Sequence, residues 1–158
     1  MGNITTNFSI DELLASQTAS RHGWSEQFNP SPMVLDNLMS LAQGLEIVRA
    51  LLGSNKMVIS SGYRCARVNA AVGGSSNSAH MLGLAADFMC PKFGKPIDIC
   101  RRLAATTNLE FDQVIYEYGN WCHFAVGPDR RRQCLSKFAN DPTYYLGILE
   151  APNVTLVA

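Results

Sequence analysis

Two histidines, an aspartate and a glutamate are the side chains of this sequence whose types and spacing could perform chemistry. His80 lies seven residues before Asp87, and Glu117 lies six residues before His123. Two imidazoles and a carboxylate can hold a zinc ion with an open fourth position, and a second carboxylate can act as the general base of a hydrolase. The four residues therefore predict a metal-dependent hydrolase.

An explanation without a metal must be weighed against this pattern. A single histidine is more often an ordinary, partly buried side chain, which is how we interpret His22. Asp87 and Glu117, however, each stand in an apolar run, where an unpaired carboxylate would be costly to bury and a dication would relieve that cost. Arg64 or Arg67 could neutralise one of the carboxylates instead, and the sequence leaves this alternative open.

Composition places the chain among globular proteins. It has 158 residues, of which 47% are hydrophobic, and this content supports a core and argues against disorder. We expect a single domain over residues 1–158. The formal net charge is zero, so no basic field indicates a nucleic-acid partner. The one basic run, residues 130–132, is interpreted as a solvated helix face.

The sequence contains no apparent targeting or anchoring segment. No apolar stretch approaches the roughly 20 residues that span a bilayer, and the N-terminus lacks the regions of a signal peptide. We therefore expect synthesis in the cytoplasm and no stable membrane association. The five cysteines are an odd number without a Cys-x-x-Cys pair, which favours reduced thiols and argues against a cysteine-ligated zinc ribbon.

Start and stop signals predict the helices. Ser9 with Glu12 three residues later is a capping box, and Ser31 followed by Pro32 is a cap with proline in the first turn. The apolar period after Pro32 predicts a long helix that ends at Leu52, before a glycine. Further helices are expected over residues 64–72 and 96–107, and a loop over residues 27–32.

Short apolar runs predict strands over residues 57–60, 84–89, 113–117 and 121–126. The last two form a hairpin around Gly119 and Asn120. Glu117 and His123 then lie on adjacent strands, about 5 Å apart as cross-strand neighbours. Cys122 alternates with His123 and is expected to pack in the core. The segment after the hairpin is predicted to contain a small helix and a tail.

The residues around the candidate side chains form blocks in a fixed order. The first pair lies in the pattern Ser78-x-His80-x-x-Gly83-x-Ala85-x-Asp87. Residues 60–64, 69 and 72–74 precede this pattern, and residues 111–117 and 121–123 follow it. These blocks resemble the M15 zinc peptidases, the D-Ala-D-Ala carboxypeptidase group, and in particular its M15A-like branch. The resemblance runs from Phe8 to Arg132.

The resemblance implies an α+β fold, with a small antiparallel sheet and helices packed on one side, as in hedgehog-like and D,D-peptidase domains. It also implies that His80, Asp87 and His123 ligate zinc, while Glu117 activates the attacking water and later protonates the leaving amine. Several members of the family carry this acid three residues before the last histidine. That position is Asn120 here, which cannot act as a base.

Three further side chains receive roles from the resemblance. Arg64 would hold a substrate carboxylate or polarise the scissile carbonyl, since a guanidinium suits planar oxyanions. Ser78 and Gln113 would support the zinc ligands through hydrogen bonds.

The substrate implied by the resemblance is a peptidoglycan peptide. The bond could be L-Ala-D-Glu, D-Ala-diaminopimelate or terminal D-Ala-D-Ala, and the sequence leaves these open. A compact chain without a separate wall-binding module resembles phage endolysins, which are made in the host cytoplasm and released to the wall. We therefore favour a monomeric endopeptidase of bacteriolysis, by analogy. A D,D-carboxypeptidase and a non-catalytic, metal-stabilised module of a wall binder or virion are the alternatives.

Overall fold

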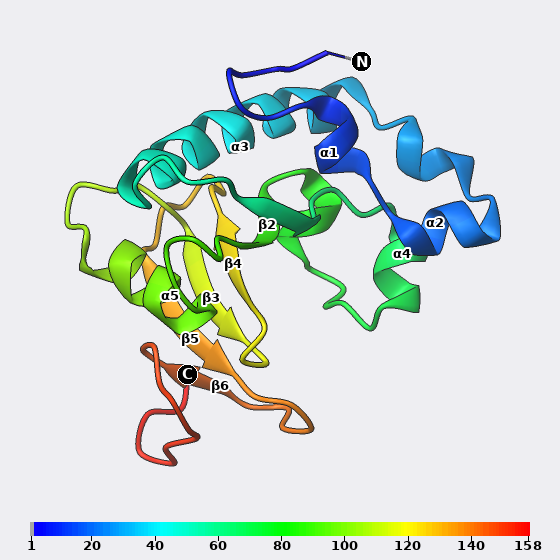
Figure 1. Cartoon of the computed structure of the whole chain (residues 1–158). Coiled ribbons are helices and arrows are strands. Elements are labelled where there is room, and N and C mark those ends of the chain that lie inside the picture. Colours follow the sequence, from blue (N-terminus) through cyan, green and yellow to red (C-terminus); the bar gives the residue numbers. More distant parts are fainter. Residues whose placement is uncertain (1) are drawn as a thin grey trace.

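The computed structural model describes residues 2–158 and has a mixed α+β architecture, as predicted (Figure 1). Its helices are α1 (Ile10–Leu14), α2 (Gln17–His22), α3 (Pro32–Leu51), α4 (Ala66–Ala71) and α5 (Pro96–Ala105), with 3-10 turns η1 (Ser25–Phe28) and η2 (Ala79–Leu82). Its strands are β1 (Val58–Ser61), β2 (Ala85–Met89), β3 (Gln113–Glu117), β4 (Trp121–Ala125), β5 (Gln133–Lys137) and β6 (Tyr144–Leu146).

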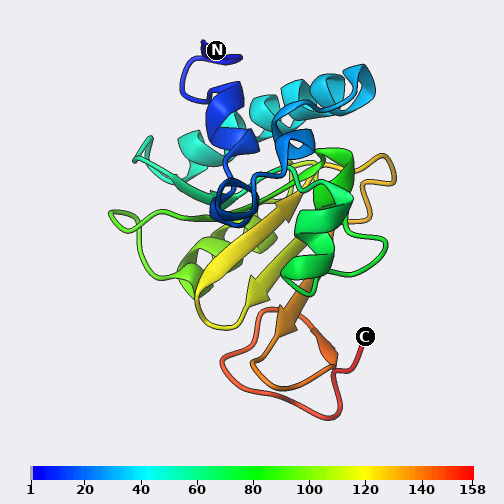
Figure 2. The same ribbon diagram turned by 90° about the vertical axis from the view of Figure 1, so that its right-hand side faces the viewer.

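The six strands form one sheet in the order β1-β2-β4-β3-β5-β6. Every neighbouring pair is antiparallel except β3 and β5, which run parallel. The sheet is therefore largely antiparallel, as the sequence predicted, with one parallel pair near its far edge. Figures 1 and 2 show β5, β6 and the C-terminal tail at the end of the molecule opposite α3.

The longest helix, α3, begins and ends where its signals predict. The hydroxyl of Ser31 accepts a hydrogen bond from the backbone N–H of Val34 at 3.3 Å, and Pro32 occupies the first turn. The helix ends at Leu51, within one residue of the prediction. Gly53 follows with φ of 73°, a left-handed conformation that glycine adopts without strain.

The core lies between one face of the sheet and the helices α1, α3 and α5. Phe88 and Phe124 of the central strands are fully buried there, against a group of helix side chains. These are Leu13, Leu38, Leu41, Leu45, Ile99 and Leu103. Gly44 allows the close approach of α3, because a Cβ at this position would lie 2.8 Å from Val126 Cγ1 and 3.3 Å from Phe124. Helices α1, α3 and α5 therefore cover this side of the sheet, whereas the 3-10 turn η2 contacts β2.

Strand alternation separates this core from the candidate site. Phe88 and Cys122 point into the core, so their neighbours Asp87 and His123 face the opposite side of the sheet. Cys122 is fully buried, which confirms its interpretation as a packing residue. All five cysteines are free thiols in the structure, as predicted.

The prediction for the C-terminal part was wrong in two respects. The segment after the hairpin contains strands β5 and β6 in place of a small helix. The basic run at residues 130–132 is a loop, because Arg130 and Arg132 have φ of 46° and 53°, which a right-handed helix excludes. Arg131 bonds through Nε and Nη2 to the carboxylate of Asp112, at 2.8 Å each, and so fastens this loop to the start of β3.

Helix α2 and turn η1 were not predicted. Helix α2 is six residues long and lies between two caps: the hydroxyl of Ser16 accepts a hydrogen bond from the backbone N–H of Ala19, and Gly23 follows the last residue. Within residues 2–158, no helix has the length and apolar character needed to cross a membrane.

Candidate metal centre and active site

A short turn followed by a strand positions the first two candidate ligands. The hydroxyl of Ser78 accepts a hydrogen bond from the backbone N–H of His80 at 3.3 Å and caps η2. Gly83 ends this turn with φ of 72°, packed so closely on α3 that a Cβ would lie 3.0 Å from two atoms of Val34. The chain then enters β2, and the side chain of Asp87 lies on the same face of the sheet as that of His80.

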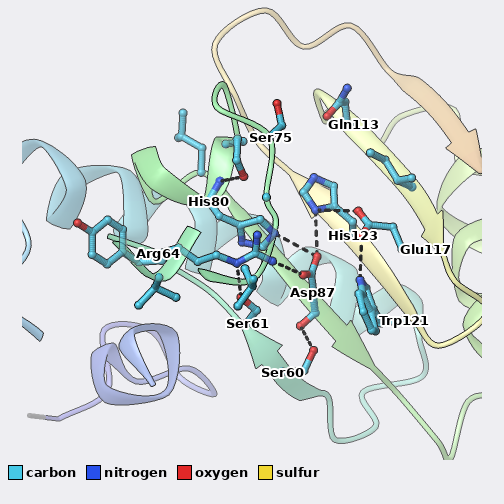
Figure 3. Close-up of a pocket in the computed structure, with 18 of the residues that line it drawn as sticks. Ser60, Ser61, Arg64, Ser75, His80, Asp87, Gln113, Glu117, Trp121 and His123 are labelled. Atoms are coloured by element: carbon cyan, nitrogen blue, oxygen red, sulfur yellow. Dashed lines mark hydrogen bonds and ion pairs between the residues drawn. The ribbon is translucent and has the colours of Figure 1, made fainter. Parts of the chain in front are cut away.

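Strand pairing brings the third candidate ligand to the same place. In the β2–β4 register, Asp87 lies directly opposite His123. Asp87 Oδ1 lies 3.2 Å from His80 Nε2 and 3.0 Å from His123 Nδ1 (Figure 3). All three side chains are buried, and one donor atom from each lies within 4.8 Å of the others. Zinc ligands at about 2.0–2.2 Å from one ion lie at separations of this order, so the donor set fits a metal.

A hydrogen bond to the backbone fixes the orientation of His80. Its Nδ1 lies 2.7 Å from the carbonyl oxygen of Gly62. Because a carbonyl only accepts, Nδ1 carries the proton and Nε2 is left to coordinate. Gly62 itself is held against α1, where a Cβ would overlap the carbonyl of Leu13. The backbone carbonyl of Gly62, directly after β1, therefore sets the tautomer of this imidazole.

Burial and neighbouring charges favour the metal-binding protonation state of two of the three side chains, Asp87 and His80, whereas the Asp87 carboxylate favours the protonated form of His123. Burial alone would raise the pKa of Asp87, but the two imidazoles hold it well below its usual range. Burial lowers the pKa of His80 despite the neighbouring carboxylate. Burial also opposes the charge on His123, but its hydrogen bond to Asp87 raises the pKa of this imidazole overall. Asp87 is thus ionised and His80 neutral at pH 7, as ligation requires.

Glu117 lies beside this cluster on β3. It pairs directly with Trp121 across the hairpin, while His123 pairs with Ile115, so Glu117 and His123 are diagonal neighbours. Glu117 Oε1 lies 3.6 Å from His123 Nδ1, and Oε2 accepts a hydrogen bond from Trp121 Nε1 at 3.2 Å. Burial raises the pKa of Glu117. A carboxylate with a raised pKa is suited to taking and returning a proton near neutral pH.

The family model described as Peptidase M15 matches residues 6–125, which is most of the chain and includes all four candidate residues. The chain belongs to the M15 peptidase family. M15 peptidases depend on a metal, so this M15 peptidase is a metallopeptidase with His80, Asp87 and His123 as the cluster that could hold the ion. No curated protein among those compared matches the chain.

Arg64 contacts the cluster of the M15 peptidase directly. Its Nη2 lies 3.0 Å from Asp87 Oδ2, and its Nε donates to Ser61 Oγ at 3.0 Å (Figure 3). The pair uses the oxygen of Asp87 that the imidazoles leave free. Arg64 therefore neutralises part of the buried charge of Asp87, as the alternative without a metal expected. Oδ1 of Asp87 still contacts both imidazoles. Arg67 instead pairs with Glu26, at 3.2 Å.

The two supporting residues differ in their placement. Ser78 acts on the backbone of His80 through the cap described above. Gln113 shares a sheet face with Glu117 and donates through Nε2 to Gln133 Oε1 at 2.6 Å. In Figure 3 it lies apart from Asp87. Support of the ligands by Gln113 stays a prediction.

Two contacts of the site escaped sequence reasoning. Trp121 donates to Glu117, and Ser61 holds Arg64. The first follows from the hairpin register, which a loop of three residues between Glu117 and Trp121 could have indicated. The sequence around Ser61 gave no comparable signal, because its contact with Arg64 depends on the conformation of the turn after β1.

Proposed function

We propose that this M15 peptidase is a zinc-dependent peptidoglycan peptidase that cleaves a peptide bond of the stem or the cross-link. The observation that supports it most is the buried convergence of His80, Asp87 and His123, with a second carboxylate, that of Glu117, 3.6 Å from His123. A purely structural site needs no such free base. Mixed imidazole and carboxylate ligands make zinc the leading choice among divalent ions.

The side chains around the cluster have separable tasks in this proposal. A bound zinc ion would supply a polarising charge for the scissile carbonyl and make water acidic enough to attack near neutral pH. Glu117 takes the proton of the attacking water on its free oxygen and returns it to the leaving amine. Trp121 fixes the other oxygen of Glu117. Arg64 offers its partly exposed guanidinium edge to a substrate oxygen.

The shape of the cleft favours an endopeptidase. An open cleft of about 2310 Å³ includes the cluster, and its lining also includes Arg21 of α2 and Tyr144 of β6. Asp87 and His123 lie on the central strands β2 and β4, and the lining of the cleft continues to residues of α2 on one hand and of β5 and β6 on the other. A carboxypeptidase needs such room on only one side. We therefore propose an endolysin-type enzyme of bacteriolysis, made in the cytoplasm of a bacterial host and acting on its wall.

Mass spectrometry of purified peptidoglycan digested by the protein tests this proposal. We expect new amino termini within the stem or cross-link, and none when a chelator is present. Release of terminal D-Ala alone would replace the endopeptidase by a D,D-carboxypeptidase. An unchanged digest, from protein shown to contain zinc, would contradict the proposal and favour the non-catalytic module.

A further inference from the structure

The floor of the cleft beyond Glu117 is built by strands that lie outside the family match. That match ends at Ala125, whereas β5 and β6 begin at Gln133 and Tyr144. In the sheet, Glu117 pairs with Lys137, and Lys137 pairs with Tyr144. Directly paired residues share a face of the sheet. Trp121, Glu117, Lys137 and Tyr144 therefore form one row across β4, β3, β5 and β6.

A second row lies beside the first and starts at the metal cluster. His123 pairs with Ile115, Ile115 with Leu135, and Leu135 with Leu146. Ile115 and Leu135 line the cleft, and Leu146 is 45% exposed. The surface that continues from the site across the sheet is thus apolar along its middle and carries one cation, Lys137, along its side.

The ammonium group of Lys137 is held by a backbone carbonyl, and the Asp141 carboxylate acts on it through its charge without forming one of the ion pairs of residues 2–158. It donates to the backbone carbonyl of Asp141 and lies 6.0 Å from the ring centroid of Tyr118 and 5.5 Å from that of Tyr144. The carboxylate of Asp141 is used locally, by the backbone N–H of Thr143 and the hydroxyl of Tyr145.

Among the ion pairs of residues 2–158, none includes Lys137. Its nearest cross-strand neighbour on β3 is the acidic Glu117, yet the two do not form one of these pairs. A cation fixed between two tyrosine rings, with unused donors, is complementary to a negatively charged ligand group.

We propose that Lys137, framed by Tyr118 and Tyr144, binds a free carboxylate of an extended substrate peptide that lies across β5 and β6. The inference rests on the proposed function, because it names the part of a peptide substrate that is recognised next to Tyr118 and Tyr144, two residues that line the cleft. Neighbouring strands are about 4.8 Å apart and an extended residue rises about 3.3 Å. The recognised carboxylate therefore belongs to a residue within about three positions of the scissile bond.

Synthetic stem peptides test the inference. The parent peptide keeps all its free carboxylates, and in each derivative a different one of these carboxylates is replaced by a carboxamide. The affinity of the zinc-loaded protein for each peptide is measured by calorimetry, together with kcat/KM for cleavage. For one carboxylate position, we expect the wild-type protein to prefer the acid over the amide by about tenfold, since a charge-assisted hydrogen bond is lost with the amide. Equal affinities for acid and amide at every position would overturn the inference.

Variants then assign the preference to a residue. Lys137→Met should reduce the ratio of the two affinities to near one, and Lys137→Arg should retain it. Lys92→Met, which removes an exposed lysine between β2 and α5, should leave the ratio unchanged. If Lys137→Met keeps the wild-type ratio and the peptides are cleaved, the inference is overturned and the proposed function is unaffected. If no peptide is cleaved but the ratio is present and lost in Lys137→Met, the inference stands and the proposed function fails.

Discussion

The variant Glu117→Gln should lower kcat on a peptidoglycan peptide by roughly 10²–10⁴-fold, the range that a positioned general acid–base group contributes. Glutamine keeps the size of the side chain and an oxygen that can accept the hydrogen bond from Trp121 Nε1. It cannot take a proton from the attacking water. Bound zinc per chain and the midpoint of thermal unfolding should therefore match those of the wild-type protein.

A matched control separates this effect from a general loss of charge. Glu150 is an exposed acid whose partner is Arg101, at 3.5 Å on the surface. Glu150→Gln should leave kcat within about twofold, as expected for an exposed pair of little energetic weight. The kcat of both variants would be measured from the number of new amino groups in samples quenched at successive times. A Glu117→Gln protein with wild-type kcat would show that another group is the base.

The second large effect concerns the ligands. His80→Ala and Asp87→Ala should each reduce bound zinc from one ion per chain to well below one, measured by elemental mass spectrometry after dialysis. Each change removes one of three buried donors that converge within 4.8 Å. Structural and catalytic zinc sites need at least three protein ligands in defined geometry, so two donors hold the ion too weakly to survive dialysis.

The third histidine provides the control for the ligand variants. His22 is exposed at the end of α2, where Nδ1 lies 2.9 Å from the carbonyl of Thr18 and the ring stacks on Trp24. His22→Ala should keep full zinc content. Stoichiometric zinc in both His80→Ala and Asp87→Ala would refute the ligand assignment, even if cleavage were lost.

Local patterns predicted the parts of the site that short segments build. The turn around Gly83 and the strand with Asp87 lie in one stretch of ten residues, and the hairpin of β3 and β4 carries its own turn signal. Serine caps and a proline in the first turn located α3 because these signals act through adjacent backbone groups. The proximity of Glu117 to His123 follows from such features, whereas the α+β fold was expected from the family resemblance.

Contacts between distant segments could not be read in the same way. Strand β5 pairs in parallel with β3 across a loop held by Arg131 and Asp112, and its mixed sequence has no apolar alternation of its own. Its strand state depends on the neighbouring strand. The ion pair between Arg64 and Asp87 joins residues 23 positions apart through the turn after β1. Both features exist only once the sheet is assembled.

The dependence of cleavage on the metal is the central claim, and a zinc titration tests it most directly. Protein freed of metal by a chelator is mixed with increasing zinc, and the initial rate of amino-group release from a peptidoglycan peptide is recorded. The buried donors His80, Asp87 and His123 form one site, so the rate should rise from near zero in proportion to zinc and level off at one equivalent per chain. Full cleavage before any zinc is added would contradict the claim.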